Sequence, residues 1–184
     1  MRTKVWGLAA SAGITLAACT ATDPSPREPA AAYGPPARAL AADVRDAAGM
    51  TMARATVSEI GESIRVRVEA MGMRAGAYGA HVHTTGRCDA PDFASAGPHW
   101  NPTGHQHGKN NPRGMHKGDL PNLAVGTDGR GNFEIIIPGA SIGAGPNALL
   151  DADGAAVVIH AAADDYRTDP SGNSGGRIAC GVLG

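Results

Sequence analysis

Aromatic residues are scarce in this 184-residue chain, because Trp, Tyr and Phe together make up 4% of it. Hydrophobic residues nevertheless reach 42%, enough for a core of Val, Ile, Leu and Ala, so the chain is not disordered. The formal net charge is −1 and no run of Lys or Arg occurs, which excludes nucleic acid as a partner. The longest apolar stretch, residues 5–18, is too short for a transmembrane helix, which needs roughly 17 to 25 residues.

Glycine and proline are abundant instead, at 26 and 13 residues, a content that argues against a helical bundle. Short alternating or β-branched runs predict about eight antiparallel strands, and therefore a sandwich or barrel. The predicted strands lie near 38–45, 50–60, 63–70, 79–83, 123–125, 132–137, 155–160 and 177–183. Residues 127–131 predict a hairpin turn. Two long connections, 85–122 and 161–176, break the short-turn rule, and loops of that length are usually functional.

The N-terminus predicts an export signal and a lipid anchor. Arg2 and Lys4 precede the apolar run, in the order of a secretory signal peptide. The run ends at Leu16-Ala17-Ala18-Cys19, which resembles a bacterial lipoprotein cleavage box; ordinary secretion is the alternative. We predict a signal peptide at 1–18, a lipid-anchored Pro/Ala-rich tether at 19–36 and a folded domain at 37–184. Removing the signal leaves 14 basic and 17 acidic residues, a net charge of −3.

Histidines are concentrated in one predicted strand and the long loop that follows it. His81 and His83 lie two residues apart in that strand, so both side chains project from one face and could share an ion. The loop adds His99, His107, His116 and Asp119, at spacings of 8, 9 and 3. Three imidazoles and one carboxylate suit a tetrahedral zinc site, and four protein ligands make such a site structural. His105 is the extra histidine, and we expect it to be solvated.

His160 ends the predicted strand 155–160, where its side chain can meet His81 and His83 across the sheet. An all-imidazole ligand set suits copper as well as zinc. The residues by themselves thus predict a secreted β-domain with a histidine site for one or two metals, and they leave the reaction open.

Five segments match one protein family in order and spacing. They are G-A-H-V-H at 79–83, G-P-H-W-N-P at 97–102, H-x8-H-x2-D at 107–119, A-V-V-I-H at 156–160 and G-N-S-G-G-R-I-A-C-G-V at 172–182. Together they resemble the copper/zinc superoxide dismutases in a bacterial secreted form. The resemblance implies an all-β, eight-stranded antiparallel Greek-key barrel or sandwich, with a long metal-binding loop and a shorter active-site loop. It also implies an enzyme that dismutates superoxide.

Carried over residue by residue, the resemblance implies two metals that share one histidine. The copper ligands would be His81, His83, His99 and His160. The zinc ligands would be His99, His107, His116 and Asp119, with His99 as a bridging imidazolate. Asp164 matches a carboxylate that hydrogen-bonds ligands of both metals. Cys88 and Cys180 match the family's intrachain disulfide; thiolate metal ligands are the weaker alternative, since neither lies in a C-x-x-C.

The implied substrate is the superoxide anion, which has to approach a protein of net charge −3. Arg177 matches the family's guiding arginine beside the copper, which supplies a local positive field. The loop 161–176 is shorter than in eukaryotic members and lacks their Glu and Lys cluster. Further steering candidates are therefore Lys109, Arg113 and Lys117. We expect the protein in the periplasm or cell envelope, attached to a membrane through Cys19.

Two other functions are weighed against this one. A metal-buffering lipoprotein of the same fold, without dismutase turnover, would be favoured if a copper ligand or Arg177 were missing, and none is. A zinc hydrolase needs an open zinc position and a general base, and a four-ligand site offers neither. The oligomeric state is left open, with a homodimer as one option.

Overall fold

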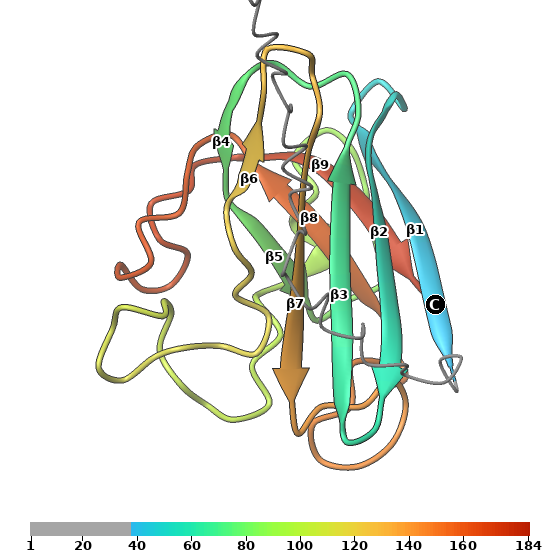
Figure 1. The fold of residues 1–184 in the computed structure, drawn as a ribbon. Coiled ribbons are helices and arrows are strands. Elements are labelled where there is room, and N and C mark those ends of the chain that lie inside the picture. The colour runs from blue at the N-terminus through green and yellow to red at the C-terminus, as the bar shows by residue number, and fades with distance from the viewer. Residues whose placement is uncertain (1–37) are drawn as a thin grey trace, which may run out of the picture. The chain divides into compact units, whose positions relative to one another are not determined.

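The computed structural model describes residues 38–184, so the predicted signal peptide, Cys19 and the tether lie outside the described residues. The described part contains nine strands and one short 3-10 turn (Figure 1). They are β1 (Ala39–Asp46), β2 (Thr51–Ile60), β3 (Ser63–Ala70), β4 (Gly76–Tyr78), β5 (Ala80–His83), η1 (Ala94–Ala96), β6 (Leu123–Val125), β7 (Gly131–Pro138), β8 (Ala155–His160) and β9 (Arg177–Leu183). Within residues 38–184, no helix is long and apolar enough to cross a membrane.

Seven strands form one curled antiparallel sheet in the order β5-β8-β9-β1-β2-β3-β7 (Figure 1). Within this sheet β9, the last strand along the chain, pairs with β1, the first, and Arg45 lies opposite Cys180. β4 and β6 form a separate two-stranded sheet. The all-β prediction is confirmed, and each of the eight predicted strands is present. The ninth, β4, has only three residues, too few for a period-two pattern to be detected.

Successive side chains of a strand point to opposite faces of the sheet, so every second side chain lies in the core. In β3, Ile64, Val66 and Val68 are fully buried while Arg67 is exposed. β8 is buried along its whole length because its second face is also covered. There Val158 packs with Phe93 from the loop between β5 and β6. The strand that ends at His160 is thus held on both faces.

The turn at 127–131 forms, but the strands that it joins do not pair as a hairpin. Gly126 N donates to Arg130 O at 2.8 Å, and Gly129 adopts a left-handed φ of 75°. β6 pairs with β4, whereas β7 pairs with β3. Local turn chemistry therefore reverses the chain here, and pairing is decided by strands distant in sequence.

Two long connections, 84–122 and 161–176, lie on the same side of the sheet (Figure 1). They are hydrogen-bonded to one another: Asn110 N donates to Tyr166 O at 2.9 Å, and Asn122 Nδ2 donates to Asp164 O at 2.9 Å. The contact between them requires a glycine at 108, where a Cβ atom would lie 2.2 Å from Tyr166 O. The candidate site is built where these loops meet the ends of β5 and β8.

Candidate metal centre

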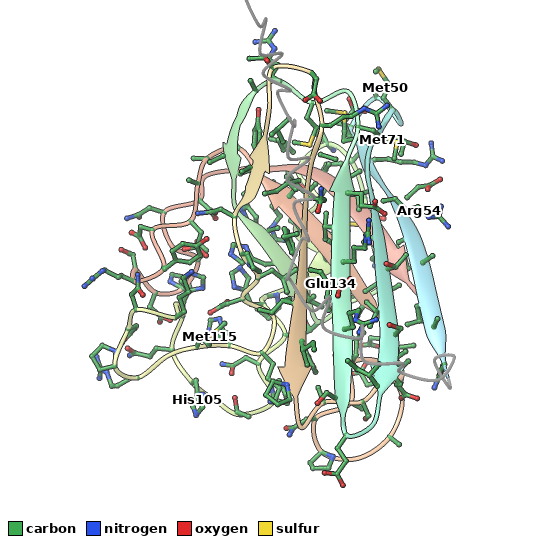
Figure 2. All side chains as sticks on the ribbon, viewed as in Figure 1. Met50, Arg54, Met71, His105, Met115 and Glu134 are labelled. Carbon is green, nitrogen blue, oxygen red and sulfur yellow. A yellow bond between two sulfur atoms is a disulfide. The ribbon has the colours of Figure 1, made fainter. Side chains whose placement is uncertain are left out.

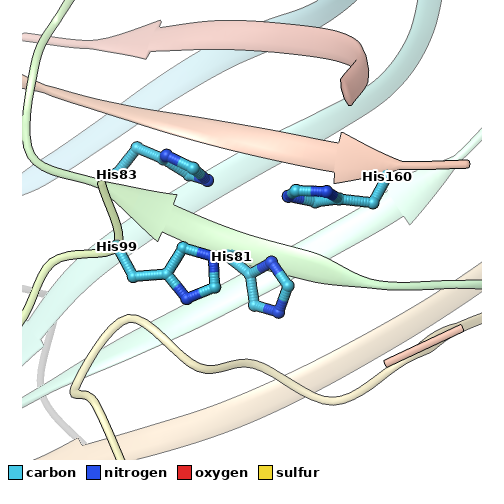
Figure 3. A group of neighbouring side chains, drawn as sticks. All are labelled: His81, His83, His99 and His160. Carbon is cyan, nitrogen blue, oxygen red and sulfur yellow. The ribbon is translucent and has the colours of Figure 1, made fainter. Parts of the chain in front are cut away.

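Four histidines from three parts of the chain converge in one buried cluster (Figure 3). His81 and His83 come from β5, which pairs with β8, and His160 is the last residue of β8. His99 comes from the long loop and is brought alongside His83 by an isolated antiparallel bridge. One ring nitrogen of each of the four lies within 4.8 Å of the others. Strand pairing therefore places these imidazoles together, and we call them the four-histidine cluster.

Three imidazoles of this cluster have one nitrogen bonded to an oxygen that can only accept. His83 Nδ1 donates to Gly97 O at 2.8 Å, and His160 Nδ1 donates to Gly175 O at 3.1 Å. His81 Nε2 donates to the Asp164 carboxylate at 2.9 Å. Their other nitrogens, at His81 Nδ1, His83 Nε2 and His160 Nε2, are buried without a hydrogen-bond partner. Such lone pairs are costly to bury unless a cation accepts them, so the residues fit a bound metal.

Burial keeps these rings neutral at physiological pH. Desolvation lowers the pKa of His81 to about 3, that of His83 to about 2 and that of His160 to about 4. The neutral imidazole is the form that binds a metal. These three histidines are therefore already in the metal-binding form at neutral pH.

A second cluster surrounds one oxygen of Asp119, and we call it the Asp119 cluster. Asp119 Oδ1 lies 3.0 Å from His99 Nδ1, 3.0 Å from His107 Nδ1 and 3.1 Å from His116 Nδ1. The Nδ1 atoms of His99 and His116 are 3.4 Å apart. Ligands of a tetrahedral zinc ion, at about 2 Å from the metal, are separated by about 3.3 Å. These four distances match edges of a tetrahedral ligand shell.

The Asp119 carboxylate divides its two oxygens between the backbone and this shell. Oδ2 accepts from Gly108 N at 2.8 Å and from His116 N at 3.0 Å, which leaves Oδ1 for the imidazoles. Burial acts to raise the pKa of Asp119, but hydrogen bonds with His107, His116 and His99 outweigh this effect. The net result is a pKa well below the usual range of a carboxyl group. Burial acts to lower the pKa of His107, but the carboxylates of Asp119 and Asp164 outweigh this effect and raise the pKa to about 9. The cluster therefore favours positive charge at its centre.

Asp164 connects the two clusters, in the position that the family resemblance implies. One oxygen lies 2.9 Å from His81 Nε2 and the other lies 3.0 Å from His107 Nε2. Tyr166 N donates to the second oxygen at 2.6 Å. Gly172 packs directly against it with a φ of 65°, and a Cβ atom there would lie 1.8 Å from Asp164 Oδ1. A single carboxylate thus orients one ring in each cluster.

We expect Asp164→Asn to weaken retention of metal in both clusters by about 10- to 100-fold, because an amide can accept from one imidazole only and its NH2 would face the other. The measurement is metal content after dialysis against graded concentrations of a chelator. Asp165→Asn is the matched control, because the Asp165 side chain is exposed and bonds only within its own loop. Equal retention in both variants would contradict the orienting role of Asp164.

A cavity of about 830 Å³ opens onto the four-histidine cluster. Its lining includes His83, His99 and His160, together with Arg177 and Asp92. The Arg177 guanidinium donates to Phe93 O and to Gly97 O, both at 2.7 Å. Gly97 O is also the acceptor of His83 Nδ1. One loop carbonyl therefore joins the arginine to a ring of the cluster.

The other predicted cations do not line this cavity. Lys109 Nζ lies 4.0 Å from the centre of the Tyr166 ring, and Lys117 Nζ donates to Pro138 O at 2.9 Å. Arg113 is exposed on the long loop. His105 is also exposed on the long loop (Figure 2) and belongs to neither cluster. Among the predicted steering residues, only Arg177 lines the cavity.

Cys88 and Cys180 form a disulfide with a Cα–Cα distance of 5.6 Å, which confirms the predicted pair. The bond joins the loop after β5 to β9, the strand that begins at Arg177. It therefore fixes the segment that supplies the carbonyl acceptors of Arg177.

Two residues that support the site are absent from the sequence predictions. The side-chain amide of Asn122 bonds the Asp164 backbone twice: Nδ2 donates to Asp164 O at 2.9 Å, and Oδ1 accepts from Asp164 N at 2.8 Å. Tyr166 OH accepts from Asn122 N at 2.7 Å, and Tyr166 has a left-handed φ of 61°. Neither belongs to a ligand pattern, and only the fold brings them together. A polar residue at the end of a long loop is the one signal that could have indicated Asn122.

The family model described as copper/zinc superoxide dismutase (SODC) matches residues 51–183. The chain belongs to this family. The superoxide dismutase [Cu-Zn] of Caulobacter vibrioides is 42% identical over 146 residues, covering 78% of this chain and 81% of that protein. Superoxide dismutase [Cu-Zn] 1 of Aquifex aeolicus is 38% identical over 144 residues, covering 77% and 85%.

Superoxide dismutase-like proteins are also among the relatives. YojM of Bacillus subtilis is 48% identical over 124 residues, which cover 66% of this chain and 63% of YojM, less than two thirds of its length. The crystal structure of a SOD-like protein from Bacillus subtilis superposes with a TM-score of 0.73 at 40% identity, covering 78% of this chain and 97% of that chain. The all-β fold of the dismutase family is thus shared along nearly the whole described domain.

Proposed function

We propose that this chain dismutates superoxide to oxygen and hydrogen peroxide at the four-histidine cluster. Membership of the family makes it an oxidoreductase that uses copper and zinc. The observation that carries the proposal is that His81, His83 and His160 each have a buried imidazole nitrogen without a hydrogen-bond partner, and that His83 and His160 line a cavity open to solvent. In this proposal the copper ligands are His81, His83, His99 and His160, and the zinc ligands are His99, His107, His116 and Asp119.

His99 is the proposed bridge between the metals because it belongs to both clusters. Its Nδ1 lies on the Asp119 side, which leaves Nε2 for the four-histidine cluster. Distance alone also groups His81 with His99, His107 and Asp119, and leaves His116 out. We assign His116 to zinc nevertheless, because its Nδ1 lies 3.1 Å from Asp119 Oδ1. His81 Nε2 is already held by Asp164, and its Nδ1 is left for copper.

The reaction consumes two superoxide anions and two protons. One anion gives up an electron and leaves as oxygen; the other accepts an electron and two protons and leaves as hydrogen peroxide. Copper, when bound, supplies the change of oxidation state, which zinc cannot supply. Arg177 attracts and orients the anion from the cavity wall, where two carbonyls fix its guanidinium. His99, fixed through Nδ1, is positioned to release and take up a proton at Nε2.

The deciding experiment is metal analysis of the purified mature domain combined with a superoxide assay. We expect one copper and one zinc per chain, with activity that is lost on chelation and restored by copper but not by zinc alone. The metal-buffering alternative is not favoured, because every predicted copper ligand and Arg177 are present in the site. Full metal content without dismutase activity would support that alternative and contradict the proposal.

We expect Arg177→Ala to slow dismutation about tenfold and to flatten its dependence on ionic strength, because the positive charge that attracts the anion is removed. The measurement is the rate over a series of salt concentrations. Arg113→Ala removes the same charge from an exposed position outside the cavity, and its salt profile should match that of the unaltered protein. A steep, unchanged profile in Arg177→Ala would contradict steering by this residue.

We also propose that the protein is exported to the periplasm and anchored to a membrane through a lipid on Cys19. Cys88 and Cys180 are bonded to each other, so Cys19 is the one remaining cysteine of the three. The substitution Cys19→Ser should move the protein from membrane fractions to the soluble fraction, as measured by fractionation and immunoblotting. Cys19→Ser protein that still sediments with membranes would contradict the anchor.

A further inference from the structure

Methionines gather at the adjoining ends of β2 and β3, two strands that carry no histidine. Four of the five methionines within residues 38–184 form two pairs of the pattern M-x-M, Met50 with Met52 and Met71 with Met73. β2 and β3 pair antiparallel along their length, and Met71 N donates to Met52 O at 2.9 Å at the end of that ladder. Met52 and Met71 therefore lie side by side where β2 begins and β3 ends, and Met50 and Met73 each lie two residues away, outside the strands.

The four side chains range from largely exposed to buried. Met50 is 64% exposed and Met71 is 41% exposed, and both lie at the same end of the domain (Figure 2). Met52 is partly buried and packs against the edge of the core, whereas Met73 is buried in it. Three thioethers thus remain within reach of a solute, at Met50, Met52 and Met71.

The backbone under Met50 is fixed while its side chain is free to adjust. The Asp46 carboxylate accepts from Ala48 N and Met50 N, both at 2.9 Å, and Asp46 N donates to Met50 O at 3.0 Å. Methionine is unbranched, with three rotatable bonds and a polarizable sulfur. Residues 39–80 contain no histidine or cysteine, so the thioethers are the soft donors of this region.

We propose that Met50, Met52 and Met71 form an accessory surface site for monovalent copper, separate from the histidine clusters. Thioether sulfur is a soft, neutral donor, and soft donors select Cu(I) over Zn(II). Because a thioether does not titrate, the site binds without releasing protons. The histidines come from β5, β8 and the long loop, so both kinds of site can be filled at once. The accessory site lets the protein capture reduced copper at its surface.

The proposal is tested on the full chain with the histidine clusters already loaded with copper and zinc. Ag(I) is the probe, since it shares the softness of Cu(I) and is inert to oxidation here. In protein labelled with ¹³C at the methionine methyl groups, Ag(I) should shift the signals of Met50, Met52 and Met71 and leave that of Met115 in place. Unshifted signals for the three methionines would overturn the proposal.

Substitution by leucine removes the sulfur and keeps the apolar volume. The triple variant Met50→Leu, Met52→Leu, Met71→Leu should lose the additional Cu(I) equivalent that the loaded protein takes from a chromophoric competitor under anaerobic conditions. Met115→Leu is the control and should keep it. If the triple variant does not fold, Met71→Leu by itself should weaken the additional binding. Retention of that equivalent in a folded variant would overturn the proposal. Dismutase activity, measured on the same samples, should be unchanged, so this result is separate from that for the histidine clusters.

Discussion

Replacing His160 by alanine should reduce dismutation to the level of the metal-free protein and leave zinc bound. His160 Nε2 is one of the buried lone pairs of the four-histidine cluster, and Arg177 lines the same cavity. Loss of this ring removes one of the four proposed copper ligands and leaves a small cavity among the remaining imidazoles. The Asp119 cluster keeps all its members, because Asp119 Oδ1 contacts three other imidazoles. The substitution therefore separates the two metals.

The measurement is copper and zinc content per chain together with the rate of superoxide loss. His105→Ala is the matched control, because it removes an exposed imidazole that belongs to neither cluster. The control should keep both metals and full activity. Full activity in His160→Ala would remove the copper assignment, and loss of zinc as well as copper would contradict the independence of the Asp119 cluster.

The sequence predicts the strands well because most of them bury one face. In β3, Arg65 and Arg67 alternate with Val66 and Val68, so the period of two is visible without a structure. β4 escapes detection because three residues contain too little alternation. The turn at 127–131 is predicted from its glycines, but the partners of β6 and β7 are not, since pairing depends on strands far away in the chain. Residues local in sequence predict local structure, and sheet topology requires distant contacts.

The candidate site, too, is predictable from the sequence only in part. The spacing of His81 and His83 already indicates a shared face, and β5 carries both. By contrast, the orientation of loop cations is not encoded in spacing. Lys109 lies over Tyr166 and Lys117 bonds Pro138 O, so each is held by a partner that the sequence does not place near it. Arg177 differs because β9 begins at this residue, and strand pairing opposite His160 sets its position.

The double substitution Cys88→Ala, Cys180→Ala should lower the free energy of unfolding by roughly 4 to 5 kcal/mol. The disulfide spans 92 residues, and in the chain-entropy model a cross-link of that length removes about this much loop-closure entropy from the unfolded state. Urea unfolding should be measured on the metal-free protein, because a metal that binds only the folded state adds its own stabilisation.

Activity should fall in the same variant, because the disulfide holds the loop against β9. Phe93 and Gly97, whose carbonyls fix the Arg177 guanidinium, both lie on that loop. Chemically reduced protein is the control, since it keeps the sulfur atoms that pack with Val158 and loses only the cross-link. Equal destabilisation of the two samples would assign the effect to the cross-link. Destabilisation of the double variant alone would instead assign it to packing around Cys180, and the loop would then hold Arg177 without the disulfide.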